Sequence, residues 1–171
     1  VSGSRPYPGA AAYCDFNAGD LVIAASTGGV AFADTVASDL YWGVVVGVKQ
    51  YYDAGRGCIT GGTKLPDNTT WSGQANASIL LVVPVTAGVW EVMADDATTF
   101  TTEATYRAAV GENADISFNA SSTTKKAHPR LDISGHATTY TLGWKIVDLA
   151  PRVGVDYAGA NVPLLVVANR H

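Results

Sequence analysis

The chain has 171 residues, of which 47% are hydrophobic and only 15% are charged, and its formal net charge is −4 at pH 7. Soluble globular proteins usually have about 25% charged residues, so much of this surface must be neutral, which favours a subunit covered by neighbours. The negative balance argues against a sequence-independent nucleic-acid binder, and no apolar run approaches the roughly 18 residues of a membrane span. Cys14 and Cys58 are too few for a disulfide framework, so we expect free thiols.

An extended arm is predicted at the N-terminus, at residues 1–18, followed by a single β-rich domain at residues 19–171. Within the first twelve residues, Pro6, Pro8 and Gly9 argue against regular structure. No linker divides the rest of the chain, so one domain with a substantial core is expected.

The first predicted strands form a hairpin, followed by a central strand. Residues 21–25 and 30–33 flank the turn signal Gly28-Gly29, an arrangement typical of a β-hairpin. Residues 40–49 are predicted to form the central strand, in which glycines indicate a bend, a bulge or a close approach of another backbone. Turn residues at 51–57 then predict a second hairpin.

The most apolar stretch of the chain, residues 79–96, follows a long region, 61–78, that is predicted to be irregular. Irregular loops of this length usually carry function or contacts. Pro84 and Gly88 break the apolar stretch into two strands and a turn, which we expect to form a central strand pair. Residues 79–83 lack polar alternation and are predicted to be buried on both faces or to lie beneath another sheet.

One short helix is predicted at residues 101–110, with a Thr as N-cap, Glu103 at the positive end of its dipole and Gly111 as a left-handed C-terminal residue. Later strands are predicted at 115–118, 130–134, 140–149 and 162–168. Alternation in the third of these places one set of side chains on the core face: Tyr140, Leu142, Trp144 and Ile146. About nine to eleven short strands and one short helix predict an all-β fold, an antiparallel β-barrel or a jelly-roll-like sandwich.

The acidic and histidine side chains do not form a recognisable catalytic motif. The three histidines, His128, His136 and His171, are predicted to be solvated loop residues, and no nucleophile-elbow motif occurs. His128 and His136 could share a strand face with Asp132, but Ser134-Gly135 is predicted to turn the chain and break that face.

Asp95-Asp96 offers paired carboxylates, but neighbouring strand residues point to opposite faces. A turn or a cap for the following helix is therefore predicted. We expect no catalytic, cofactor-binding or metal-binding residues and no cofactor.

The four tryptophans divide between core and loop. Trp42, Trp90 and Trp144 fall inside predicted strands and are expected in the core. Trp71 lies in the long irregular region and is a candidate for an interface. A sugar-binding platform built from these rings is the alternative interpretation.

Seven segments follow one another along most of the chain, from about Gly19 onward and without the region from Gly61 to Ser78. They are Gly19-Asp20-Leu21-Val22, Gly43-Val44-Val45-Val46-Gly47, Tyr52-Asp53-Ala54, Val89-Trp90-Glu91-Val92-Met93-Ala94-Asp95-Asp96, Gly111-Glu112-Asn113-Ala114-Asp115-Ile116, Leu131-Asp132-Ile133-Ser134 and Leu164-Leu165-Val166-Val167-Ala168-Asn169-Arg170-His171. In this order they resemble the small β-rich decoration, or cement, proteins of tailed bacteriophages.

This resemblance implies a non-enzymatic structural virion protein, made in the host bacterial cytoplasm and placed on the outer surface of the head. Its expected partners are the major capsid protein, whose adjacent subunits it would bridge, and further copies of itself in a homotrimer, with no nucleic acid and no membrane. The alternative is a carbohydrate-binding or adhesin-type β-sandwich module. Residues expected at the interface are Pro6, Tyr7, Pro8, Tyr51, Tyr52 and Trp71.

Overall fold

A computed structural model describes residues 3–6, 16–24, 30–33, 41–53, 56–65, 79–96, 98–118 and 129–169. Contacts group them into two compact units, one formed by the described residues up to Pro84 and the other by those from Val85 on. The strands of each sheet pair antiparallel, and the described elements include one short α-helix, which confirms the all-β prediction. Within these ranges, no helix is long and apolar enough to cross a membrane.

The expectation of one continuous domain over residues 19–171 stays a prediction, because it concerns cooperative folding, which contacts alone do not measure. The described ranges contain thirteen strands, more than predicted, because two of them are only two residues long.

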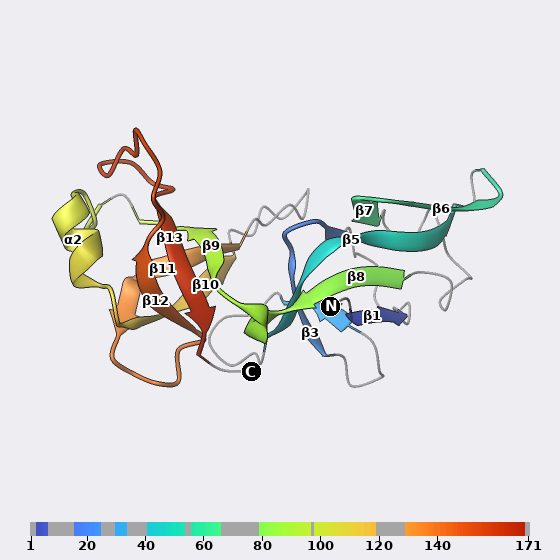
Figure 1. Cartoon of the computed structure of the whole chain (residues 1–171), viewed down its shortest axis with the longest axis horizontal. Helices are drawn as coiled ribbons and strands as arrows, with labels where there is room; N and C mark the ends of the chain where they lie inside the picture. Colours follow the sequence, from blue (N-terminus) through green and yellow to red (C-terminus); the bar gives the residue numbers. More distant parts are fainter. Residues whose placement is uncertain are drawn as a thin grey trace. The chain divides into compact units, whose positions relative to one another are not determined.

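The first unit is a six-stranded sheet built around the long strand β5 (Tyr41–Asp53). The order is β1-β8-β5-β3-β4, and β6 also pairs with β5. Figure 1 shows β8 running beside β5. The remaining strands of this sheet are β1 (Gly3–Pro6), β3 (Leu21–Ala24), β4 (Val30–Phe32), β6 (Cys58–Gly62) and β8 (Ile79–Pro84), while β2 (Phe16–Asn17) and β7 (Lys64–Leu65) form a separate pair.

The central position predicted for β5 is confirmed, and its glycines act as expected. The register with β8 shifts between Val45 and Gly47, which is a bulge. A Cβ atom on Gly43 would lie 2.7 Å from the carbonyl oxygen of Val83, so only glycine fits without a backbone shift. The predicted hairpin is also present as β3 paired with β4. Buried apolar side chains form the core of the unit: Phe16, Val22, Val30, Val45, Val48, Leu80 and Val82.

Three local predictions for the first unit are wrong. Residues 3–6 of the predicted arm form β1, which pairs with β8; Pro6 ends this outer strand, where a missing amide is tolerated. The region predicted to be irregular contains the end of β6 and all of β7, while residues 66–78 lie outside the described ranges. β8 buries Leu80 and Val82 but leaves Leu81 and Val83 half-buried, because its second face is only partly covered.

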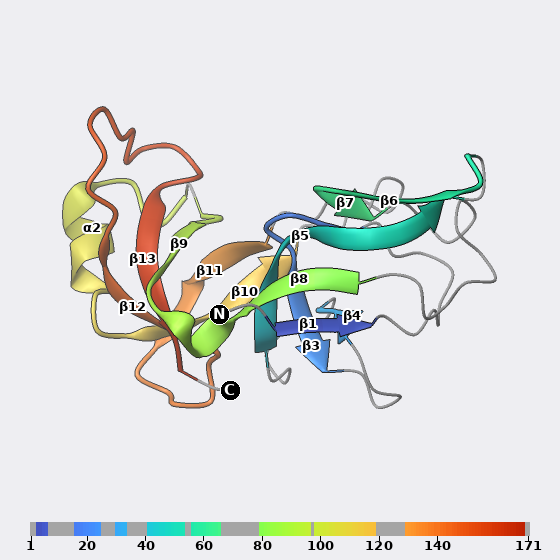
Figure 2. The ribbon, with the colours of Figure 1, turned by 45° about the vertical axis from the view of Figure 1, so that its right-hand side comes forward.

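The second unit is a five-stranded sheet of order β11-β10-β12-β13-β9. Its outer strands meet at a parallel bridge between Ala94 and Leu131, where the amide of Asp95 donates to the Leu131 carbonyl at 3.0 Å. This contact closes the sheet toward a barrel, as Figure 2 shows for β9, β13 and β11. The strands are β9 (Trp90–Met93), β10 (Asn113–Phe118), β11 (Pro129–Ala137), β12 (Trp144–Leu149) and β13 (Pro163–Ala168). The core includes Ala114, Ile116, Leu131, Ile133, Trp144, Ile146, Leu164 and Val166.

The predicted helix is present as α2 (Glu103–Ala108), shorter at both ends than expected. Thr102 is the N-cap, and its hydroxyl and that of Thr105 form a reciprocal capping box. The Glu103 carboxylate lies 2.6 Å from the Arg107 guanidinium one turn later. Gly111 has a φ of 93°, the left-handed conformation predicted for it.

The apolar stretch 79–96 does not form a strand pair. A 3₁₀ turn, η1 (Val85–Ala87), follows Pro84, so that β8 and β9 belong to different sheets. Trp90 therefore lies in an outer strand and is half-buried, with its indole Nε1 donating to the Val85 carbonyl at 2.8 Å. The core assignment is confirmed for Trp144, whereas Trp42 and Trp90 are only half-buried.

Candidate interaction surfaces

The residues predicted for the interface are only partly described. Tyr7, Pro8 and Trp71 lie outside the described ranges, while Pro6 and Tyr52 are placed as members of β1 and β5. The side chain of Tyr51 is half-buried and packs against the core of the first unit. Part of this ring therefore serves the fold, and the interface expected at these six residues stays a prediction.

An uncharged strand edge is exposed in the first unit. Strand β6 pairs with β5 in a hairpin, and within the described ranges it has no second partner strand. The side chain of Ile59 is 63% exposed, and Cys58 is a free, exposed thiol, as predicted; Cys14 lies outside the described ranges. Neither a charge nor a proline occurs in β6, although these are the usual protections against pairing with another chain.

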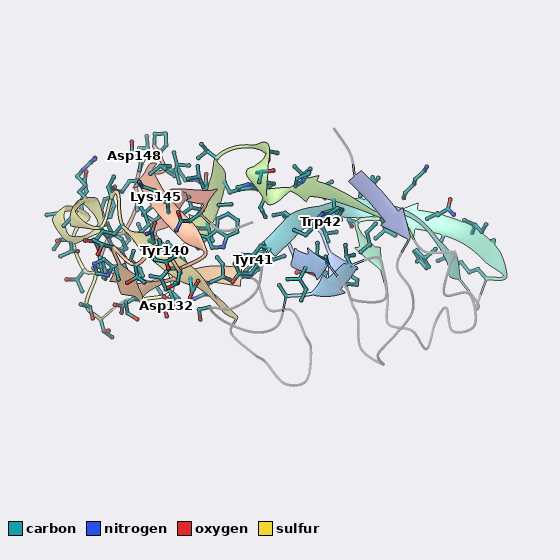
Figure 3. All side chains as sticks on the ribbon, turned by 90° about the horizontal axis from the view of Figure 1, so that it is seen from below. Tyr41, Trp42, Asp132, Tyr140, Lys145 and Asp148 are labelled. Carbon is teal, nitrogen blue, oxygen red and sulfur yellow. The ribbon has the colours of Figure 1, made fainter. Side chains whose placement is uncertain are left out.

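The second unit exposes a loop, residues 138–143, that the sequence analysis predicted in part as a strand. Figures 1 and 2 show it in orange between β11 and β12, extending beyond the strand ends. Strand β12 begins only at Trp144, so the prediction of a strand from Tyr140 is wrong for 140–143. Trp144 and Ile146 face the core as predicted, whereas the side chain of Tyr140 is 79% exposed. Tyr140 is labelled among the side chains of the second unit in Figure 3.

Polar side chains from distant strands hold this loop. The amide nitrogen of Asn113 lies 3.1 Å from the Thr139 carbonyl and 3.5 Å from that of Thr138. The amide nitrogen of Asn169 donates to the carbonyls of Tyr140 and Leu142, at 3.1 and 3.0 Å.

A buried carboxylate fixes the end of the loop. Asp115 accepts a hydrogen bond from the backbone N–H of Gly143 at 2.7 Å, and the backbone N–H of Asn169 donates to the Gly143 carbonyl at 2.8 Å. The loop backbone is thus satisfied from the protein side, which leaves Thr138, Thr139, Tyr140 and Thr141 exposed.

The sequence alone does not identify this loop as a candidate surface. A local signal was present, since three threonines surround Tyr140 and Gly143 precedes the strand. The partners that hold the loop lie 25 to 29 residues away along the chain, so spacing alone did not identify them.

Asp96 forms a turn, as predicted, while Asp95 contacts β11. Asp96 accepts hydrogen bonds from the amide and the hydroxyl of Thr98, both at 2.7 Å, and from the amide of Thr99. The Thr98 amide is the main reason that the pKa of Asp96 falls to about 2. Asp95 accepts a hydrogen bond from the Ile133 amide at 3.3 Å, and burial, with a smaller effect of Asp132, raises its pKa.

His136 is not a solvated loop residue, so that prediction is wrong. It lies in β11, with Nδ1 2.8 Å from the Ile133 carbonyl and Nε2 3.3 Å from Glu112. Its ring meets Phe100 edge-on at a centroid distance of 5.1 Å. These contacts exist because β11 bulges at Ser134-Gly135, the predicted turn, where Asp132 accepts from both residues. His128 and His171 lie outside the described ranges.

Within the described ranges, no three His, Cys, Asp or Glu side chains gather closely enough to hold a metal ion. The two features that stand out are the β6 edge and the 138–143 loop, both exposed and both without charged side chains. No family model matches the chain, and no match was found among the curated proteins or the solved structures.

Proposed function

We propose that the chain is a non-enzymatic structural virion protein that binds the outer surface of a tailed-phage head and bridges adjacent major capsid subunits. One observation carries the proposal: each of the two units presents an exposed, uncharged contact element, β6 in the first and the 138–143 loop in the second. A bridging protein needs at least two contact surfaces, and neutral elements suit contacts that bury apolar area and backbone groups.

Three further features support the same function. The ordered segments that resemble decoration proteins are spread over both units, so the resemblance does not rest on one strand or one turn. A charged share of 15% suits a homotrimer seated on a capsid, where neighbours cover part of the surface. The free thiol of Cys58 fits synthesis in a reducing host cytoplasm before the protein joins the virion.

A carbohydrate-binding module is the competing function. Sugar sites of that kind use several exposed aromatic rings on one face, whereas Tyr140 is the single exposed aromatic ring among the side chains whose exposure the structure describes. This difference favours a protein partner.

The test uses heads assembled from the major capsid protein of the same genome without this chain. Purified protein should co-sediment with these heads and appear as added density at three-fold positions in cryo-electron microscopy. Mass photometry should show trimers in solution or trimeric density on the head. Failure to co-sediment, together with specific binding on a glycan array, would replace the proposed function with the carbohydrate-binding one.

A further inference from the structure

The 138–143 loop combines an exposed aromatic ring with a backbone that is held on the opposite side. Two Asn amides and one buried carboxylate occupy five backbone groups of this short segment: the carbonyls of residues 138, 139, 140 and 142 and the amide of residue 143. The Leu142 amide donates to the Thr139 carbonyl within the loop. A loop restrained in this way loses little conformational entropy when it docks, so more of the contact energy remains for affinity.

The exposed side chains have the composition of a recognition loop. Tyr supplies a large ring with few rotatable bonds, and short hydroxyl side chains around it adapt their hydrogen bonds to a partner. Thr138, Thr139 and Thr141 provide such hydroxyls around Tyr140. Leaving a ring 79% exposed forgoes apolar burial in the free protein, and that burial is recovered if the ring enters a pocket.

The occupant that fits this loop is another protein. The loop has no cation for a phosphate, which argues against nucleic acid and anionic lipid. It presents one projecting ring and not a set of rings on which a sugar could stack. A single aromatic anchor surrounded by small polar groups is typical of a protein interface hot spot.

We infer that residues 138–143 form a preorganised docking loop whose Tyr140 ring enters an uncharged pocket on the major capsid protein. This inference rests on the proposed function and assigns one of its contacts. Tyr140 is the specificity-determining anchor, while Asn113, Asn169 and Asp115 are positioning residues that hold the loop backbone.

The test measures binding of the full chain to undecorated heads. Tyr140→Ala should weaken binding by about 30-fold or more, the loss expected for a hot-spot residue, with an unchanged melting temperature because the ring is exposed. Val153→Ser is the matched control, since Val153 is a fully exposed apolar residue in another loop of the same unit. It should bind like the wild type.

A second variant tests the restraint of the loop backbone independently of the Tyr140 ring. Asn169→Ala keeps Tyr140 but releases the carbonyls of residues 140 and 142. Binding should weaken several-fold, and hydrogen exchange should accelerate at the amides of Leu142 and Gly143. A purely structural role of Asn169 would change the melting temperature without this local exchange.

The outcomes separate the two proposals. If the wild type binds heads and Tyr140→Ala binds within about twofold of it, the docking inference is overturned while the proposed function stands. If the wild type does not bind heads at all, the proposed function fails and the inference fails with it. A glycan-array signal that Tyr140→Ala abolishes would make the loop a sugar site and overturn the protein partner.

Discussion

At the residue scale, two adjacent carboxyl groups have opposite environments. Asp96 follows strand β9 and accepts hydrogen bonds from a turn, chiefly from the Thr98 amide, so its pKa lies at about 2. Asp95 is half-buried against β11, and the pKa of its carboxyl is raised by burial. The charged form is thus favoured by the fold at one residue and disfavoured at the next.

The Asp96→Asn substitution should lower the free energy of unfolding by about 1 to 2 kcal/mol at about pH 7, because charge-assisted hydrogen bonds are lost. A folded pKa below the ordinary value of 3.8 means that this stabilisation is complete above 3.8 and is lost as the pH falls through about 2. Urea unfolding of both proteins over this range should show that their difference in free energy of unfolding disappears in acid. A difference that stays constant with pH would show that the charge of Asp96 is not its cause.

Asp95→Asn, at the neighbouring residue, should have the opposite pH dependence of stability. The raised pKa means that Asp95 contributes stability below 3.8 that is lost as the pH rises through the folded value. At about pH 7 the substitution should leave the free energy of unfolding unchanged or raise it by up to about 1 kcal/mol, since an uncharged amide is easier to bury. The same urea series measures this change in the free energy of unfolding. A decrease as large as that of Asp96→Asn would contradict the raised pKa of Asp95.

At the scale of the element, the β5–β6 hairpin depends on one of two neighbouring glycines. A Cβ atom on Gly61 would lie 2.5 Å from the Lys49 carbonyl oxygen and 3.0 Å from that of Val48, whereas one on Gly62 would meet nothing within 4 Å. Both clashes are with backbone, so Gly61→Ala must displace β6 from β5. We expect about 1 to 3 kcal/mol of destabilisation and faster hydrogen exchange in β6.

Gly62→Ala is the matched control for this change. It adds the same methyl group one residue later into open space, so stability should stay the same or rise slightly through the entropy of the unfolded chain. Thermal melts and hydrogen exchange of both variants would measure these changes in stability. Equal losses in the two proteins would mean that the close approach to β5 is not what restricts residue 61.

Elements with local signals could be predicted from the sequence. The capping threonine defines the N-terminal end of α2, Gly111 takes the predicted left-handed conformation just beyond the helix, and the β-branched run with its glycines identifies β5. Elements that depend on partners far away along the chain could not be predicted in this way. Nothing near Tyr140 indicates that Asn113 and Asn169 hold its backbone, and nothing in residues 79–96 indicates that Pro84 and η1 separate two sheets. The candidate loop was therefore assigned to a strand.

At the scale of the whole molecule, each unit has its own core. Leu80 is fully buried in the first and Ile146 in the second. Leu80→Ala and Ile146→Ala each truncate a buried side chain and should each lower the free energy of unfolding by about 2 to 5 kcal/mol. If the units unfold separately, each substitution will lower only one calorimetric transition. The single domain predicted over residues 19–171 requires one transition with equal calorimetric and van't Hoff enthalpies, and two separate transitions would overturn it.

The charge distribution of the whole chain predicts how the proposed binding to heads responds to salt. Both contact elements lack charged side chains, and the chain as a whole carries a net charge of only −4. Adding salt to about 0.5 M shortens the screening length to roughly 4 Å, which weakens exposed ion pairs but leaves apolar burial intact or strengthened. Co-sedimentation with undecorated heads should therefore change by less than about threefold between low and high salt. Release of the protein in moderate salt would show that charged residues outside the β6 edge and the 138–143 loop hold it on the head.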